Sequence, residues 1–154
     1  MANLTPSQTI GPFFHDALRW AIADARAGVR VTGRVLDRDG KGINDALLEV
    51  WQPGWAAVPF QRVYTDENGA FAFAMPQPSG AASCANVTVF ARGLLRELFT
   101  RVYLHPSNDA AALPLPDSVS QERRATLLAR RQSDGTCRWD VRLQGPGETV
   151  FFEI

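Results

Sequence analysis

The sequence predicts a mainly β protein: an antiparallel β-sandwich with one short helix near 118–131 and an extended N-terminal arm. Short runs in which apolar and polar residues alternate recur along the chain, and this alternation is typical of strands that bury one face. Tight-turn pairs separate several of the runs: Asp39-Gly40, Asn68-Gly69 and Asp134-Gly135. Short strands joined by such turns favour two packed antiparallel sheets.

Residues 1–28 are expected to form the arm and a short helix after it. Pro6, Gly11 and Pro12 interrupt regular structure near the N-terminus, because proline lacks a backbone donor and glycine is conformationally free. Residues 16–27 are good helix formers, enough for one or two turns. A terminus seldom concentrates two prolines, a glycine and two adjacent phenylalanines unless it docks on another surface.

Residues 29–154 are expected to form the sandwich, and 1–154 a single domain, since 154 residues suffice for one hydrophobic core. Strands are expected at seven runs: 29–37, 46–51, 70–73, 86–91, 99–104, 138–143 and 149–154. The helix is expected to have Ser120 as its N-cap and to bury Leu127 and Leu128.

Charge and hydropathy exclude two classes of partner. The chain has 16 basic and 16 acidic residues, so it lacks the positive field with which proteins attract nucleic acid. No apolar run approaches the roughly 20 residues that span a bilayer, and no basic stretch followed by an apolar one opens the chain. We therefore expect no nucleic-acid partner, no membrane partner and a cytoplasmic location.

The residues that could hold a metal are few and scattered. His15 and His105 are the two histidines, and Tyr64 and Tyr103 are the two tyrosines. Cys84 and Cys137 stand far apart without CxxC spacing, so two buried thiols are expected in place of a zinc site. The chain has no GxSxG, phosphate-loop or dinucleotide motif. The residues themselves predict neither a metal site nor a catalytic residue.

Arg92 is the strongest candidate for a binding residue. It follows the apolar run Val87–Ala91 and precedes Gly93, where a side chain that leaves the sheet can point into a cleft. Fifteen of the sixteen basic residues are Arg, the side chain that binds a planar carboxylate through two hydrogen bonds. On the pattern alone, a solvated arginine at a strand end is the competing interpretation.

Five longer segments point to a known family. They are TPSQTIGPFF at 5–14, LLEVWQ at 47–52, VYTDENGAFAF at 63–73, VTVFARG at 87–93 and RWDVRLQGPGETVFFEI at 138–154. Together they resemble the intradiol ring-cleaving dioxygenases, and within them the alpha chains of two-chain members. The resemblance extends over nearly the whole chain and implies the transthyretin-like β-sandwich of that family.

The resemblance implies a non-haem ferric enzyme that opens a catechol ring between its hydroxyl-bearing carbons and inserts both atoms of O2. Two tyrosines and two histidines hold the iron, and in two-chain members they belong to the beta chain. The segment that matches the His-x-His of that chain, Cys84-Ala85-Asn86, has no histidine, and the loop at 53–62 has no tyrosine. The resemblance thus implies that this chain binds no metal and that a beta subunit holds the Fe(III).

The resemblance also implies a substrate pocket at the subunit boundary. Thr9, Gly11 and Pro12 match alpha-chain residues that line it, and Arg92 matches an arginine near the substrate's carboxylate. The implied reaction converts the small aromatic acid protocatechuate and O2 to 3-carboxy-cis,cis-muconate. Phe13 replaces a tyrosine common at that place, and the loop at 53–62 is short, so a sulfocatechol is an alternative anionic substrate.

A second hypothesis comes from a different class of protein. A free-standing transthyretin-like binding module for a small ligand or carbohydrate would share the sandwich and need neither iron nor a partner. The N-terminal arm discriminates between the two hypotheses. A binding module should be soluble and monodisperse alone, whereas an alpha chain should expose an apolar interface and depend on its beta subunit.

Overall fold

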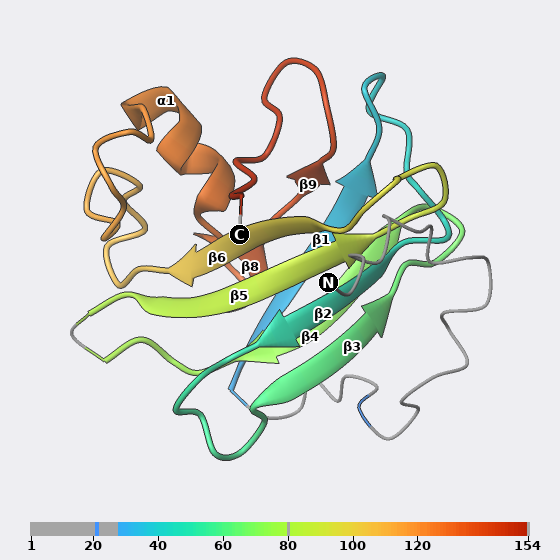
Figure 1. Ribbon diagram of the computed structural model, residues 1–154. Helices are drawn as coiled ribbons and strands as arrows, with labels where there is room; N and C mark the ends of the chain where they lie inside the picture. The colour runs from blue at the N-terminus through green and yellow to red at the C-terminus, as the bar shows by residue number, and fades with distance from the viewer. Residues whose placement is uncertain (1–20, 22–27, 80, 154) are drawn as a thin grey trace, which may run out of the picture.

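The computed structural model describes residues 21, 28–79 and 81–153. These residues form two packed sheets (Figure 1). The first has the strand order β4-β1-β8-β7, with β9 also paired with β1, and the second has the order β3-β2-β5-β6. The strands of the first sheet are β1 (Val29–Leu36), β4 (Ala70–Met75), β7 (Arg130–Arg131), β8 (Cys137–Arg138) and β9 (Val141–Arg142). Those of the second are β2 (Leu47–Trp51), β3 (Phe60–Tyr64), β5 (Ser83–Phe90) and β6 (Leu98–Leu104).

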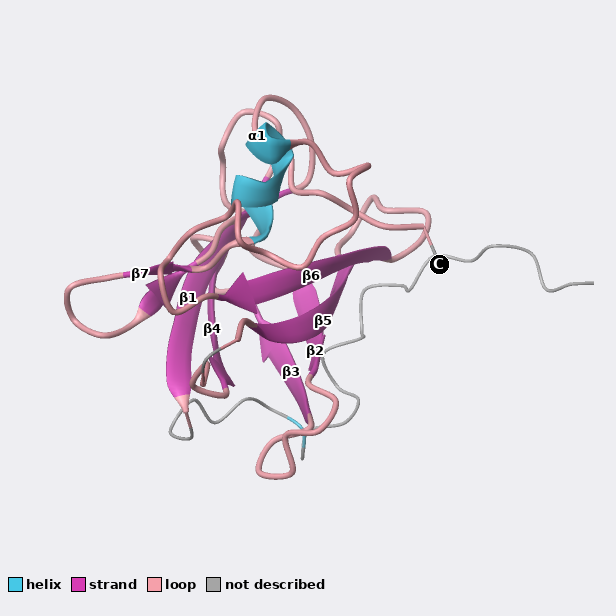
Figure 2. Ribbon diagram, turned by 90° about the vertical axis from the view of Figure 1, so that its left-hand side faces the viewer, coloured by secondary structure: helices cyan, strands magenta, loops and turns pink. Residues whose placement is uncertain are grey.

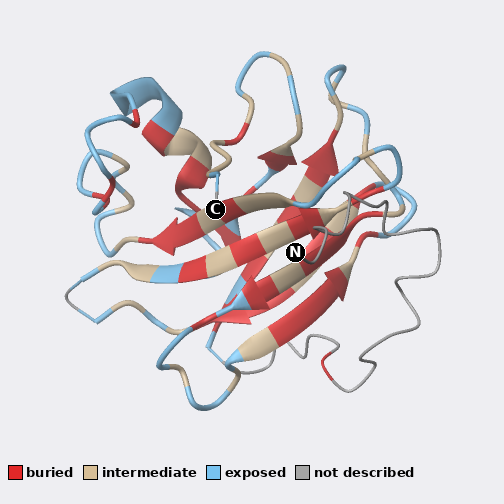
Figure 3. Cartoon of the chain, viewed as in Figure 1, coloured by how far each residue is buried: buried red, intermediate tan, exposed pale blue. Residues whose placement is uncertain are grey.

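The core lies between the sheets, and buried residues alternate with less buried ones along much of β1 and β5 (Figure 3). On β1 the buried positions include Val31 and Val35, while Arg30 between the strand's first valines is exposed. Phe73 is fully buried, and its ring meets the Trp139 ring edge-on at 6.4 Å. The predicted sandwich is confirmed, and the period-two pattern that predicted β1 and β5 follows the observed burial.

Gln61 joins the two sheets at one edge of the sandwich. Its amide Nε2 donates to the Ala74 carbonyl at 2.9 Å, and its Oε1 accepts from the Ala74 N–H at 3.0 Å. The side chain thereby pairs with β4 as a neighbouring strand would. Strand β3 is not among the expected strands, and this arrangement gives the reason. A glutamine at an inward position breaks the apolar alternation, yet its two hydrogen bonds let it be buried.

The helix is shorter than the expected 118–131. Helix α1 covers Gln121–Arg124 and a single 3₁₀ turn covers Ala125–Leu127 (Figure 2). Ser120 does stand at the N-cap, without a hydrogen bond from its side chain. The chain then extends, because the Ala129 N–H donates to the Tyr103 carbonyl and Arg130–Arg131 form β7. Leu127 and Leu128 are buried as predicted.

The expected strand at 138–143 is divided into β8 and β9, which both pair with β1 in parallel. The division falls at Gly33, where a Cβ atom would overlap the Trp139 carbonyl oxygen. Close approach of a second backbone is a common reason for glycine inside a strand. The expected strand at 149–154 is reduced to one bridge between Phe152 and Phe99 within the described residues. The pairing between named strands is therefore antiparallel except along one side of β1.

The expected arm and first helix lie outside the described residues, apart from Ala21. In the part of the chain that is described, no helix is both long and apolar enough to cross a membrane.

Candidate functional site

Arg92 lies just beyond the end of β5, in the connection to β6. Its side chain is 66% exposed, and its Nε donates to Oδ2 of Asp45, which is itself only 17% exposed. The strand register explains this contact. Strands β2 and β5 are antiparallel with Leu47 opposite Phe90, so two further residues on each strand place Asp45 opposite Arg92.

The ion pair orients the guanidinium more than it stabilises the fold. Exposed pairs contribute about 0–1 kcal/mol to the free energy of unfolding. Among the described residues Asp45 is the partner of Arg92, and it engages only Nε. The outer edge of the guanidinium therefore stays available to a ligand. Asp45 is not among the residues that the sequence indicates, because its contact with Arg92 follows from the pairing of β2 with β5.

The other three candidate residues, Thr9, Gly11 and Pro12, lie outside the described residues. Their position relative to Arg92 therefore stays a prediction. The same loop that carries Arg92 presents Leu95, whose side chain is 75% exposed. A cation and a large apolar side chain thus reach solvent from one connection between strands.

A second cluster lies at the other end of β5. Gln52, Gly54, Trp55 and Cys84 line a small pocket of about 250 Å³, together with Pro53, Pro76 and Ser83. The pocket joins the end of β2, the short loop after it and the start of β5. These are the segments that the resemblance matches to the iron centre of related chains. Cys84 is exposed, contrary to the expectation of two buried thiols, whereas Cys137 is buried.

The described side chains do not fit a ferric site of two tyrosines and two histidines. No three His, Cys, Asp or Glu residues gather anywhere in the described ranges. Tyr103 lies opposite Cys84 on β6, and burial and the adjacent thiol raise the pKa of its phenol, which disfavours a phenolate. His105 is beyond the end of β6, with Nδ1 2.7 Å from the Ser107 hydroxyl.

The two clusters are far apart within this chain. Cys84 is the second residue of β5 and Arg92 is two residues beyond its end. At about 3.3 Å per residue, the Cα atoms are separated by roughly 26 Å. A small aromatic ligand cannot reach both, so Arg92 and the pocket beside Cys84 do not form one site.

Comparison with known proteins identifies the family. The chain is 36% identical to the protocatechuate 3,4-dioxygenase alpha chain of Burkholderia cepacia, with 97% of each chain covered. It is 33% identical to the alpha chain of the same name from Pseudomonas putida, with 97% of this chain and 96% of the relative covered. The chain belongs to the protocatechuate 3,4-dioxygenase alpha-chain family. No model of a known protein family matches it.

The alignment to the Burkholderia alpha chain spans 191 positions, more than the 154 residues of this chain. That protocatechuate 3,4-dioxygenase alpha chain therefore contains segments with no counterpart here.

Solved structures agree on the fold. The dioxygenase domain of a dioxygenase and carbohydrate-binding fusion protein from Streptomyces sp. SirexAA-E has a TM-score of 0.55 at 23% identity and covers 94% of this chain and 100% of its own. Hydroxyquinol 1,2-dioxygenase from Pseudomonas putida DLL-E4 has a TM-score of 0.52 at 19% identity, with 91% of this chain and 66% of its own covered. These likenesses confirm the intradiol-dioxygenase type of sandwich expected for the alpha-chain family.

Proposed function

We propose that this chain is the alpha subunit of a heteromeric protocatechuate 3,4-dioxygenase, which cleaves protocatechuate with O2 to 3-carboxy-cis,cis-muconate. A beta subunit holds the Fe(III), and this chain shapes the substrate pocket. The observation that carries the proposal is 36% identity to a protocatechuate 3,4-dioxygenase alpha chain over 97% of both chains. The donor set described above supports the absence of iron from this chain.

Arg92 binds the substrate's carboxylate in this proposal, in a pocket completed by the partner. Two observations support it: the guanidinium is exposed, and its Nε is held by Asp45. Arg92 is too far from the pocket beside Cys84 to share a ligand with it. This distance supports the same assignment, because Arg92 would then bind a substrate held at the partner's iron and not at a centre in its own chain. The chain's contribution to the reaction is orientation of the substrate and exclusion of water.

The isolated chain should be colourless and free of stoichiometric iron. The visible band of such enzymes requires tyrosinate bound to iron, and the described residues offer no such ligand set. Absorption spectra and metal analysis of the chain purified with and without its beta subunit check this. The coloured heteromer should keep its iron in His15→Ala and His105→Ala variants, and loss of iron from either would show that this chain supplies a ligand.

Removal of residues 1–12 should weaken assembly and raise KM together. We place Thr9, Gly11 and Pro12 both against the beta subunit and beside the substrate. Sedimentation of the mixed subunits and steady-state kinetics of the truncated heteromer measure the two effects. Unchanged kinetics in a fully assembled truncated enzyme would contradict the placement of the arm at the pocket.

A further inference from the structure

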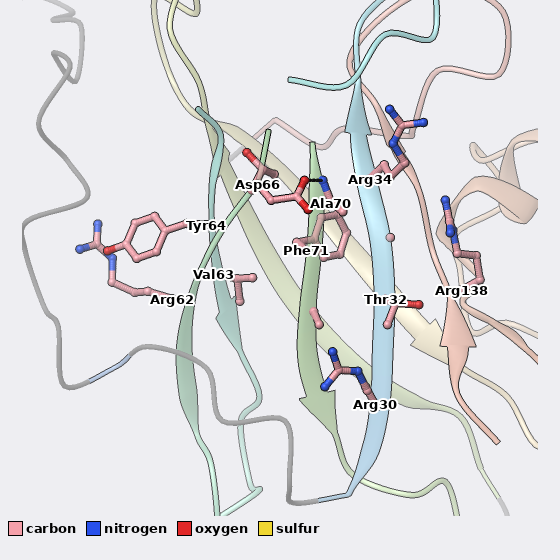
Figure 4. A pocket seen from close by; sticks show the side chains of 13 residues that line it. Arg30, Thr32, Arg34, Arg62, Val63, Tyr64, Asp66, Ala70, Phe71 and Arg138 are labelled. Atoms are coloured by element: carbon pink, nitrogen blue, oxygen red, sulfur yellow. Dashed lines mark hydrogen bonds between the residues drawn. The ribbon is translucent and has the colours of Figure 1, made fainter. Parts of the chain in front are cut away.

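An open trough of about 670 Å³ extends from the outer face of the first sheet to β3, at the edge of the second sheet (Figure 4). Its floor includes Ala70 and Ala72 of β4, and its sides include Arg30, Thr32 and Arg34 of β1. The register places Thr32 opposite Ala72 and Arg34 opposite Ala70. Because alanine side chains are short and the adjacent arginines are long, the face is hollow along β4.

The lining of this trough is strongly basic. It contains four arginines, Arg30, Arg34, Arg62 and Arg138, against one acidic residue, Asp66. This cluster is notable in a chain whose net charge is zero. One arginine is already neutralised, since Arg62 Nε lies 3.1 Å from a carboxylate oxygen of Glu49. The excess positive charge therefore comes from the two β1 arginines, because Asp140 lies against Arg138 as Glu49 does against Arg62.

Two of these guanidiniums are held in place by the protein. The Nε of Arg34 donates to the Asn68 carbonyl at 2.8 Å. The Nε and Nη2 of Arg138 both lie within 2.9 Å of Asp140 Oδ1, and Asp140 offsets part of that charge. Arg30 makes no hydrogen bond or ion pair within the part of the chain described. An exposed cation without a partner, beside two that are fixed, is an arrangement suited to an anionic ligand.

The shape of the trough favours an extended polypeptide. Arg30 and Arg34 point to the same face four residues apart, so their Cα atoms are about 13 Å apart. Side chains on one face of an extended peptide recur about every 7 Å, so carboxylates four residues apart would match the spacing of Arg30 and Arg34. Small-molecule sites enclose roughly 70–90% of their ligand, whereas this trough is open. We propose that it binds an extended acidic segment of a protein partner.

Binding of a labelled peptide tests the proposal directly. The probe is a fluorescent peptide with glutamate at alternate positions among threonines, and the control peptide has glutamine in their place. With the full-length chain, fluorescence anisotropy should detect the glutamate peptide and at least tenfold weaker binding of the glutamine peptide. Raising the ionic strength from about 0.05 M to about 0.2 M should weaken binding, because it shortens the Debye length.

Variants locate the binding surface. Arg30→Gln and Arg138→Gln should each weaken binding about fivefold, the upper end for partly exposed ion pairs. Ala72→Leu, which fills the trough without changing charge, should weaken it as well. Arg96→Gln is the matched control, because Arg96 is exposed in the connection between β5 and β6. Thermal melts confirm that each variant is folded.

Three results would overturn the proposal. The first is equal affinity for the glutamate and glutamine peptides. The second is an Arg30→Gln affinity equal to that of Arg96→Gln. The third is displacement of the labelled peptide by free citrate as effectively, per carboxylate, as by unlabelled peptide. That result would assign the arginines to a small-anion site. None of these measurements involves dioxygenase activity, so a negative result would contradict peptide binding without contradicting the proposed function.

Discussion

Replacement of Arg92 by alanine should lower kcat/KM for protocatechuate about 10- to 150-fold in the assembled heteromer. In the proposed pocket, the change removes a charge-assisted interaction with the substrate's carboxylate, of about 1.5–3 kcal/mol. Catechol lacks the carboxylate and should be far less affected. The measurement is the ratio of the two specificity constants in wild type and variant. An equal fall for both substrates would place Arg92 in the fold or the interface instead of the pocket.

Two further variants separate charge from orientation. Arg92→Lys should recover only part of the loss, because an ammonium group cannot make the two parallel hydrogen bonds of a guanidinium. Asp45→Asn keeps Arg92 but removes the carboxylate that holds its Nε. It should therefore lower the preference for protocatechuate over catechol by less than Arg92→Ala does. If Asp45→Asn lowers the preference for protocatechuate as much as Arg92→Ala does, with assembly unchanged, then Asp45 does more than position Arg92.

Gly33→Ala should destabilise the chain by about 3 kcal/mol, the upper end of the usual cost of overpacking. The new methyl group would overlap the Trp139 carbonyl oxygen and lie 2.7 Å from the Phe71 ring. The Trp139 N–H donates to the Thr32 carbonyl at 2.8 Å, so the two backbones cannot separate without breaking this bond. Urea denaturation of the isolated chain, followed by far-ultraviolet circular dichroism, measures the loss.

Gly135→Ala is the matched control for this substitution. Gly135 has a φ of 84°, and an added Cβ would meet no atom within 4 Å. Only the left-handed backbone conformation then opposes the change, at about 1 kcal/mol. If the two variants are equally stable, steric overlap at Gly33 is not what keeps that position small.

The strands that bury one face were predictable because burial imposes a period of two. The alternation in β1 and β5 arises from packing against the opposite sheet, and it is visible in the order of apolar and polar residues in the sequence. Strand β3 was not predictable, since the hydrogen-bond partner of Gln61 is on another strand. The end of the helix was missed for a similar reason. Residues 128–131 have helical propensity, but the Tyr103 carbonyl and β8 hold them in an extended conformation.

The candidate site was predictable only in part. A polar residue that follows an apolar strand reaches solvent, so the exposure of Arg92 followed from its position after Val87–Ala91. Its contact with Asp45 depends on which strands pair and in which register, and the sequence pattern of each strand alone does not contain this information. That Arg92 binds a carboxylate stays a prediction, which rests on family resemblance and not on the spacing of the residues.

The parallel pairing of β1 with β8 and β9 has a consequence for folding. Thr32 and Cys137, which are joined across this ladder, are 105 residues apart in the sequence. Contacts of such high sequence separation slow folding, because the long intervening loop must close first. During synthesis, β1 can pair with β4 long before residues 137–142 emerge. Until they arrive, one edge of β1 stays open to other chains. A chain terminated before Cys137 would keep that edge open permanently and should aggregate.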